Sequence, residues 1–170
     1  MQRSVAEIDA IVRELVEGRA NPLEPSGDQL RELLALDPAG PLQFLNLLAY
    51  HDFARYPAEH PLASEKPTGA AAYARYGEVA VRHVAARGGS LVLFNHVVGQ
   101  VIGAPARWHQ IAVMQYPNVD AFIDMVRDPD YRAALVHRDA GLARTEVHAT
   151  RPLLAAAGSA APQAAPSGRG

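Results

Sequence analysis

The segment Arg127–Ala149, "RDPDYRAALVHRDAGLARTEVHA", decides the fold. Asp128 can cap a helix that begins at Pro129, because Asp is favoured at the cap and proline at the first helical position. The run "ARTEVHATRP" (143–152) then favours a strand. At about 100° per residue, one face of the helix carries Tyr131, Ala134, Leu135 and Arg138. An arginine on this apolar face, with His137 at its edge, indicates that the helix faces a wet or ligand-filled hollow.

The same signals upstream predict the remaining elements of the chain. Strands are expected over 41–50, 90–103 and 107–117, and helices over 69–87 and 119–126, the latter two capped by Thr68 and Asn118. With the helix and strand above, the order is β-α-β-β-α-β, which is the ferredoxin-like arrangement of an α+β fold. Two additional helices precede it, one with a capping box from Ser4 to Glu7 and one from Ser26 or Asp28 to Leu36.

Two strand segments, "FLNLL" (44–48) and "LVLF" (91–94), lack the alternation of apolar and polar residues. An antiparallel sheet with one face in water alternates them, so both faces of this sheet are expected to be covered. Two helices can cover only one face. We therefore expect a homodimer in which the second faces of two sheets meet.

Composition limits the possible partners and sites. The 170 residues carry sixteen basic and eighteen acidic side chains and a net charge of -2, without the basic block that nucleic-acid binding requires. The absence of cysteine excludes disulfides, thiolate catalysis and cysteine-ligated metals. The charged, amphipathic residues 1–18 are neither a secretory signal nor a membrane span, so we expect no membrane partner and a cytoplasmic location.

Residues 41–150 resemble a known family. The order of motifs "FLNLL", "AYARYG" and "RWHQIAVMQYPNVDAFIDMVRDPDYRAALVHRDAGL" is similar to that of the domain of unknown function 1330 (DUF1330), and "YP…F…M…DPDY…HR" is its most specific part. This resemblance implies the dimeric α/β-barrel superfamily, whose members include cofactor-free monooxygenases, isomerases, haem enzymes and proteins without known activity. We expect an N-terminal helical extension (1–38), a dimeric α/β-barrel domain (39–152) and a disordered tail (153–170) rich in Ala, Pro, Gly and Ser.

Two candidate residues lie on the opening helix. Arg138 could hold an anionic or carbonyl substrate, and His137 could act as acid or base at the rim of a pocket. The resemblance strengthens His137, since "HR" follows "DPDY" in that family as well. The alternative is that Arg138 packs its stem and pairs with a carboxylate, for which the sequence offers Asp128, Asp130 and Glu146.

Aromatic candidates lie on the long helix and near the third strand. Tyr73 and Tyr76 share the stripe of the long helix with Gly77, and they could line a pocket or lie in the core with their hydroxyls bonded. Gly77 lowers helix stability, so a close approach of the sheet or of a ligand could explain it. Trp108 is expected to be a packing residue or part of the pocket wall.

Polar residues interrupt two of the apolar strands. Asn46 lies within "FLNLL" and His96 within "LFNHVV". Buried, each must find a partner, and both could point into the cavity between sheet and helices to hold a substrate oxygen and move a proton. The alternatives are a structural hydrogen bond for Asn46 and a core or dimer-interface position for His96. The proline-broken loop 50–67 could close over such a cavity or wrap a partner chain.

These candidates support two functions. The first is a cofactor-independent enzyme, an isomerase, lyase or monooxygenase, acting on a small, mostly apolar carbonyl or phenol-like compound. In it His137 or His96 moves the proton, and Asn46, a tyrosine or Arg138 holds the developing oxyanion. The second is a non-catalytic small-molecule-binding or accessory protein of the same fold. No metal-ligand spacing, phosphate-binding glycine loop or nucleophile motif is present in the sequence, so we expect neither a metal nor another cofactor.

Overall fold

The computed structural model describes residues 3–16, 21–36 and 40–153. In chain order the elements are α1 (Val5–Val16), α2 (Gly27–Ala35), β1 (Leu42–Tyr50), the 3-10 helix η1 (Pro61–Ala63), α3 (Gly69–Ala86), β2 (Ser90–His96), β3 (Gln110–Tyr116), α4 (Val119–Arg127), α5 (Pro129–Gly141) and β4 (Leu142–Thr150). The four strands form one antiparallel sheet in the order β2-β3-β1-β4. This confirms the predicted α+β, ferredoxin-like class and the two extra N-terminal helices.

Side-chain caps fix where the helices begin. The backbone N–H of Ala71 donates to Thr68, that of Ala121 donates to Asn118, and that of Asp130 donates to Asp128. The predicted capping box is present at α1, where Ser4 and Glu7 bond reciprocally, and α2 begins after Ser26, one of the two predicted starts, in a capping box with Gln29. These local signals set the boundaries at which helices and strands alternate.

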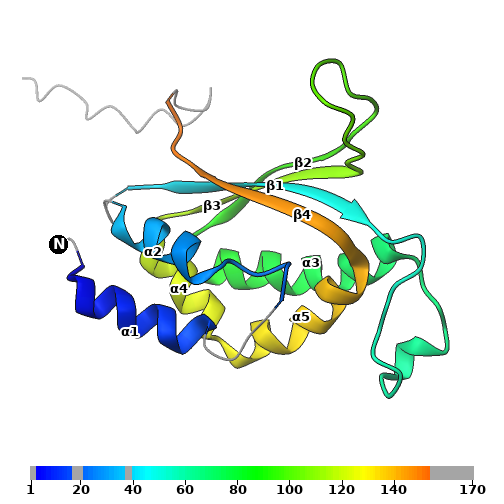
Figure 1. The fold of residues 1–170 in the computed structure, drawn as a ribbon, viewed down its shortest axis with the longest axis horizontal. Helices are drawn as coiled ribbons and strands as arrows, with labels where there is room; N and C mark the ends of the chain where they lie inside the picture. The colour runs from blue at the N-terminus through cyan, green and yellow to red at the C-terminus, as the bar shows by residue number, and fades with distance from the viewer. Residues whose placement is uncertain (1–2, 17–20, 37–39, 154–170) are drawn as a thin grey trace, which may run out of the picture.

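Two strands are shorter than the sequence predicts. β2 ends at His96 and β3 begins at Gln110, because Gly99, Gly103 and Pro105 interrupt the apolar run between them. Residues 97–109 instead form an arm that projects from the sheet on the side away from the helices (Figure 1). At its tip, Val98, Val101 and Ile102 are almost fully exposed.

All five helices lie on one face of the sheet (Figure 1). The main core cluster joins this face to helices α1 to α5, and the two N-terminal helices contribute to it directly. Leu34 of α2 has no exposed surface and Leu30 is nearly as buried. Burial of this kind stabilises each leucine by roughly 1.5–3 kcal/mol, so α2 is an integral part of the core.

The opposite face of the sheet is not covered by any described segment of the chain (Figure 1). By strand register and alternation, the apolar side chains on this face are half-exposed; they are Leu45, Leu47, Leu93, Ile111 and Val113. Continuous apolar strands thus have one face against the helices and one face open in the single chain.

Two predicted features involve residues outside the described ranges. Except for Leu153, the predicted tail 153–170 lies outside the described residues, as does the boundary predicted at 38–39. Among the residues described, no helix combines the length and apolar character needed to cross a bilayer.

Candidate functional site

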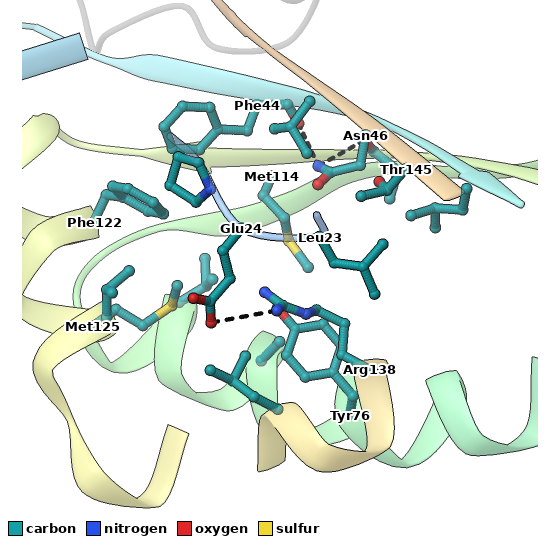
Figure 2. A pocket seen from close by; sticks show the side chains of 18 of the residues that line it. Leu23, Glu24, Phe44, Asn46, Tyr76, Met114, Phe122, Met125, Arg138 and Thr145 are labelled. Carbon is teal, nitrogen blue, oxygen red and sulfur yellow. Dashed lines mark hydrogen bonds and ion pairs between the residues drawn. The ribbon is translucent and has the colours of Figure 1, made fainter. Parts of the chain in front are cut away.

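A cavity of about 1250 Å³ lies between the sheet and the helices. Its upper wall comes from β1, β3 and β4, and its floor from α3 and α5 (Figure 2). Most of the lining is apolar, including Phe44, Leu48, Ala112, Met114, Phe122 and Met125. Ligand sites in proteins are mostly apolar hollows of several hundred Å³ with a few polar groups, and this cavity meets that description.

The helix faces predicted from the sequence of α3 and α5 line this cavity. On α3, Tyr73, Tyr76 and Gly77 line it, and on α5 Leu135 and Arg138 line it. The 3.6-residue period places these side chains on one side of each helix. The fold therefore brings Tyr73, Tyr76 and Arg138 of the predicted site together at this cavity.

Gly77 leaves open space in the cavity wall. A Cβ built on Gly77 would meet no atom within 4 Å, so neither the sheet nor another helix approaches it closely. Of the two explanations offered for a glycine inside this helix, close approach of the sheet is wrong for this residue. Room for a ligand is the explanation that remains.

Arg138 carries its charge into the cavity while only 13% of its side chain is exposed. Its Nε donates to Asp139 Oδ1 at 2.8 Å. Nη2 lies 2.7 Å from the same oxygen in an ion pair, and it is buried without a hydrogen bond of good geometry to any described residue. Burial opposes the charge, yet Asp139, Tyr76 and Tyr131 together raise the pKa of Arg138 above its ordinary value.

The second charged group in the cavity was not identified from the sequence. Glu24 Oε1 lies 3.6 Å from Arg138 Nη2, and 18% of the Glu24 side chain is exposed (Figure 2). The partners of Arg138 are therefore Asp139 and Glu24, and the three carboxylates considered from the sequence are wrong. The segment "NPLEP" (21–25) lines the cavity. No local pattern in its sequence indicates this, and from the sequence alone Glu24 belongs to a linker.

Asn46 lies on the cavity face of β1, as one of the two predicted registers requires. Its Nδ2 donates to the carbonyl oxygens of Phe44 at 2.8 Å and Ala112 at 3.2 Å. Figure 2 shows the amide oxygen of Asn46 directed into the cavity toward the side of Arg138. The side chain is thus held by its donors and presents an acceptor to the interior.

Buried tyrosines extend the polar part of the wall. The hydroxyls of Tyr76 and Tyr131 lie 2.8 Å apart, and the rings of Tyr73 and Tyr76 are neighbours at 5.4 Å. Burial raises the pKa of Tyr73 and Tyr131 well above the usual range and also raises that of Tyr76. These hydroxyls stay protonated and can donate, but they are poor bases.

His137 lies in a separate cluster outside the cavity lining. Its Nδ1 is 2.8 Å from the hydroxyl of Tyr56, and its ring is 5.7 Å from that of His60, which stacks on Tyr56 at 4.4 Å. Burial, followed by the positive charges of His60 and Arg75, lowers the pKa of His137. A neutral His137 can accept the Tyr56 hydrogen and keep Nε2 for another partner.

The loop 51–68 therefore packs on α5 at this cluster, and none of its residues lines the cavity. Tyr56 and His60 of the loop contact His137 on a different side of α5 from the one that carries Arg138. Two groups that are adjacent in the sequence thus belong to two separate sites.

Two other candidates lie elsewhere. His96 is exposed at the end of the edge strand β2 and is not part of the cavity lining. Trp108 is half-buried outside the lining, and the guanidinium of Arg144 lies 4.0 Å above its ring, as in cation–π pairs. In the described part of the chain, no three His, Asp or Glu side chains are grouped as metal ligands would be.

Comparison with known proteins identifies the family. The model of the domain of unknown function DUF1330 matches residues 61–149. The chain belongs to the DUF1330 family. Its structure is similar to that of RPA0582, a protein of unknown function from Rhodopseudomonas palustris, and to that of methylated RPA0582. The RPA0582 structure is 31% identical and covers 80% of this chain and 100% of its own. The methylated RPA0582 structure is 32% identical and covers 78% of this chain and 95% of its own. Both have a TM-score of 0.70.

A dabb-family protein with a ferredoxin-like fold from Mesorhizobium loti is 14% identical, with a TM-score of 0.42, and covers 67% of this chain and 98% of its own. No curated protein matches the sequence. Within this DUF1330 chain, Arg138 and His137 lie inside the matched residues, whereas Asn46 and Glu24 lie outside them.

The lowered pKa of His137 predicts a pH-dependent stability for the DUF1330 chain. The folded chain releases the proton at lower pH than the unfolded chain, whose histidines have a pKa of about 6.5. The contribution of neutral His137 to the stability of the folded chain is thus present above about pH 6.5 and is lost as pH falls through the folded pKa. We expect His137→Gln to flatten this fall, measured as the urea-unfolding free energy between about pH 7 and about pH 5.

The matched control is His96→Gln, which alters an exposed histidine. It should follow the wild-type curve. An unchanged pH dependence in His137→Gln would show that the Tyr56 cluster does not disfavour protonation of His137.

Proposed function

We propose that the cavity binds a small, mostly apolar molecule that carries an oxygen group. The observation that carries this proposal is the open wall at Gly77, where a helix gives up a stabilising side chain and no protein atom takes its place. Arg138 Nη2 supplies an unpaired donor and Asn46 an acceptor in the same hollow. An apolar enclosure with a few converging polar groups is what small-molecule sites share.

We also propose that two copies associate through the uncovered face of the sheet. Half-exposed Leu45, Leu47 and Val113 lie on that face, and the arm 97–109 extends beyond it with an apolar tip. Contiguous apolar surface of this kind marks an interaction site. The cavity lies on the opposite face, so association leaves it accessible.

A second candidate function is acid/base catalysis by histidine, as in a cofactor-independent isomerase, lyase or monooxygenase. The Tyr56–His137 hydrogen bond and the lowered pKa of His137 favour it, because a neutral imidazole can accept a proton near neutral pH. His137 lies outside the cavity lining, so the reacting carbonyl compound would have to bind beside the loop 51–68. His96, at the exposed strand end, would need a substrate at the sheet edge.

Binding is tested with Nile red, a neutral apolar dye whose emission rises in apolar sites. Wild-type protein should bind it, and Gly77→Leu should weaken binding by about tenfold or more because the leucine side chain projects into the cavity. The same substitution should raise the unfolding free energy by up to about 1 kcal/mol, since it removes a glycine from a helix. Fluorescence titration and urea unfolding measure the two effects.

The control is Ala71→Leu, which adds the same side chain at an exposed position of α3. It should leave dye binding unchanged. If Gly77→Leu and Ala71→Leu bind the dye as tightly as the wild type, the dye occupies another place and the cavity is not the binding site.

Dimerisation is tested by light scattering after gel filtration. The wild type should have twice the mass of the 18.2 kDa chain. Leu47→Glu should give single chains, because Leu47 pairs with Ile111 and Glu146 on the uncovered face and the new charge would be buried beside another carboxylate. Val5→Glu, at a position of α1 that is 76% exposed, should remain dimeric. A wild-type mass of one chain would refute the association.

Histidine catalysis is tested by proton exchange at the carbon next to the carbonyl of benzylacetone, in deuterium oxide. Under this candidate the wild type speeds the exchange, and His137→Gln lowers the rate by about a hundredfold or more, the usual contribution of a general base. Full exchange rates in both His137→Gln and His96→Ala, measured by NMR, would exclude His137 and His96 as the base.

A further inference from the structure

Three charged groups determine the electrostatics at the polar end of the cavity. Arg138 contributes one positive charge, while Asp139 and Glu24 each contribute one negative charge, at 2.7 Å and 3.6 Å from its Nη2. The local sum is one negative charge. Arg138 thus offers hydrogen-bond donors without offering a net positive site.

The two carboxylates use Arg138 differently. Asp139 takes the Nε hydrogen in a direct bond. Glu24 lies too far from Nη2 for a hydrogen bond, so it balances the charge but leaves the Nη2 hydrogens unused. A buried donor without an acceptor is costly, and an acceptor oxygen of a bound ligand within reach of Nη2 would satisfy it.

The structure holds Glu24 in place. The Nδ2 of Asn21 donates to Asp139 Oδ2 at 2.8 Å, and the Oδ1 of Asn21 accepts from the backbone N–H of Leu23 at 3.0 Å. Leu23 in turn packs against a core cluster with Leu48 and Leu142. This anchored turn keeps the Glu24 carboxylate at the cavity, where an incoming anion would meet it.

No other buried cation compensates. Besides Glu24 and Arg138, the ionisable side chains with charge or a ring nitrogen in the described cavity lining are all exposed; they are Glu32, Glu78, Arg82 and His148. Charges in contact with water are screened, whereas those enclosed between sheet and helices are not. The pair Arg138–Glu24 therefore dominates the selection of ligand charge inside the cavity.

We propose that Glu24 is a specificity-determining residue that makes the cavity accept a neutral oxygen acceptor, such as a ketone, and reject a carboxylate of the same shape. This inference rests on the proposed binding function and names the ligand class. Arg138 Nη2 donates to the ligand oxygen, and Glu24 repels a second negative charge at that position. The sequence alone left open whether Arg138 holds an anionic or a carbonyl group, and the charge balance selects the carbonyl.

The test compares benzylacetone with phenylbutyrate, which share a phenyl ring and a similar chain but differ in charge. By calorimetry, wild type should bind the ketone more tightly. Because an apolar cavity disfavours any carboxylate, the decisive measurement is the response to Glu24→Gln. This near-isosteric change should tighten phenylbutyrate binding by about tenfold or more, as expected for removing a like charge close by, and should alter benzylacetone binding by less than about threefold.

Asp28→Asn is the matched control, since it removes a negative charge from an exposed position of the same N-terminal extension, outside the cavity lining. It should leave both affinities unchanged, and Glu24→Ala should reproduce the gain in phenylbutyrate binding if the variant Glu24→Gln folds poorly. Phenylbutyrate binding that is equal in wild type, Glu24→Gln and Glu24→Ala, with the ketone still bound, would overturn this inference alone. Failure of both probes to bind any of these proteins would overturn the binding function itself, and the inference with it.

Discussion

The structure depends on a sheet that is covered by helices on one face and separated from them by more space than their side chains fill. Phe44 and Tyr116 pack in the main core cluster and also border the cavity, while Gly77 leaves open space in its wall. Core packing thus holds the sheet and the helices together, and a hollow remains between them. Both the enclosed polar groups and the proposed ligand site follow from this incomplete filling.

Enclosing Arg138 has a cost that the surroundings offset. A guanidinium removed from water needs acceptors and opposite charge. Asp139 meets both needs on one side, and Glu24 meets only the second. The donor that remains is the group that the proposed ligand would bond, and the Glu24 carboxylate beside it comes from the N-terminal segment.

The fold could be read from the sequence because its signals are local. The caps at Thr68, Asn118 and Asp128 and the helical stripes set the element order, and they place Tyr73, Tyr76 and Arg138 on the correct faces. Positions that depend on distant contacts could not be read. Glu24 enters the cavity through a turn whose partners are more than a hundred residues away. His137 and Arg138 are adjacent, yet only His137 contacts the loop 51–68, which is distant from it in the sequence.

The segment carrying Glu24 lies outside residues 61–149, which the DUF1330 model matches, whereas Arg138 lies inside them. Substituting Glu24 would alter the charge that faces the cavity, while Arg138 and the other residues of 61–149 would keep their sequence. Under the proposed function, the charge that selects the ligand and the donor that binds it are therefore encoded in two separate segments of the chain.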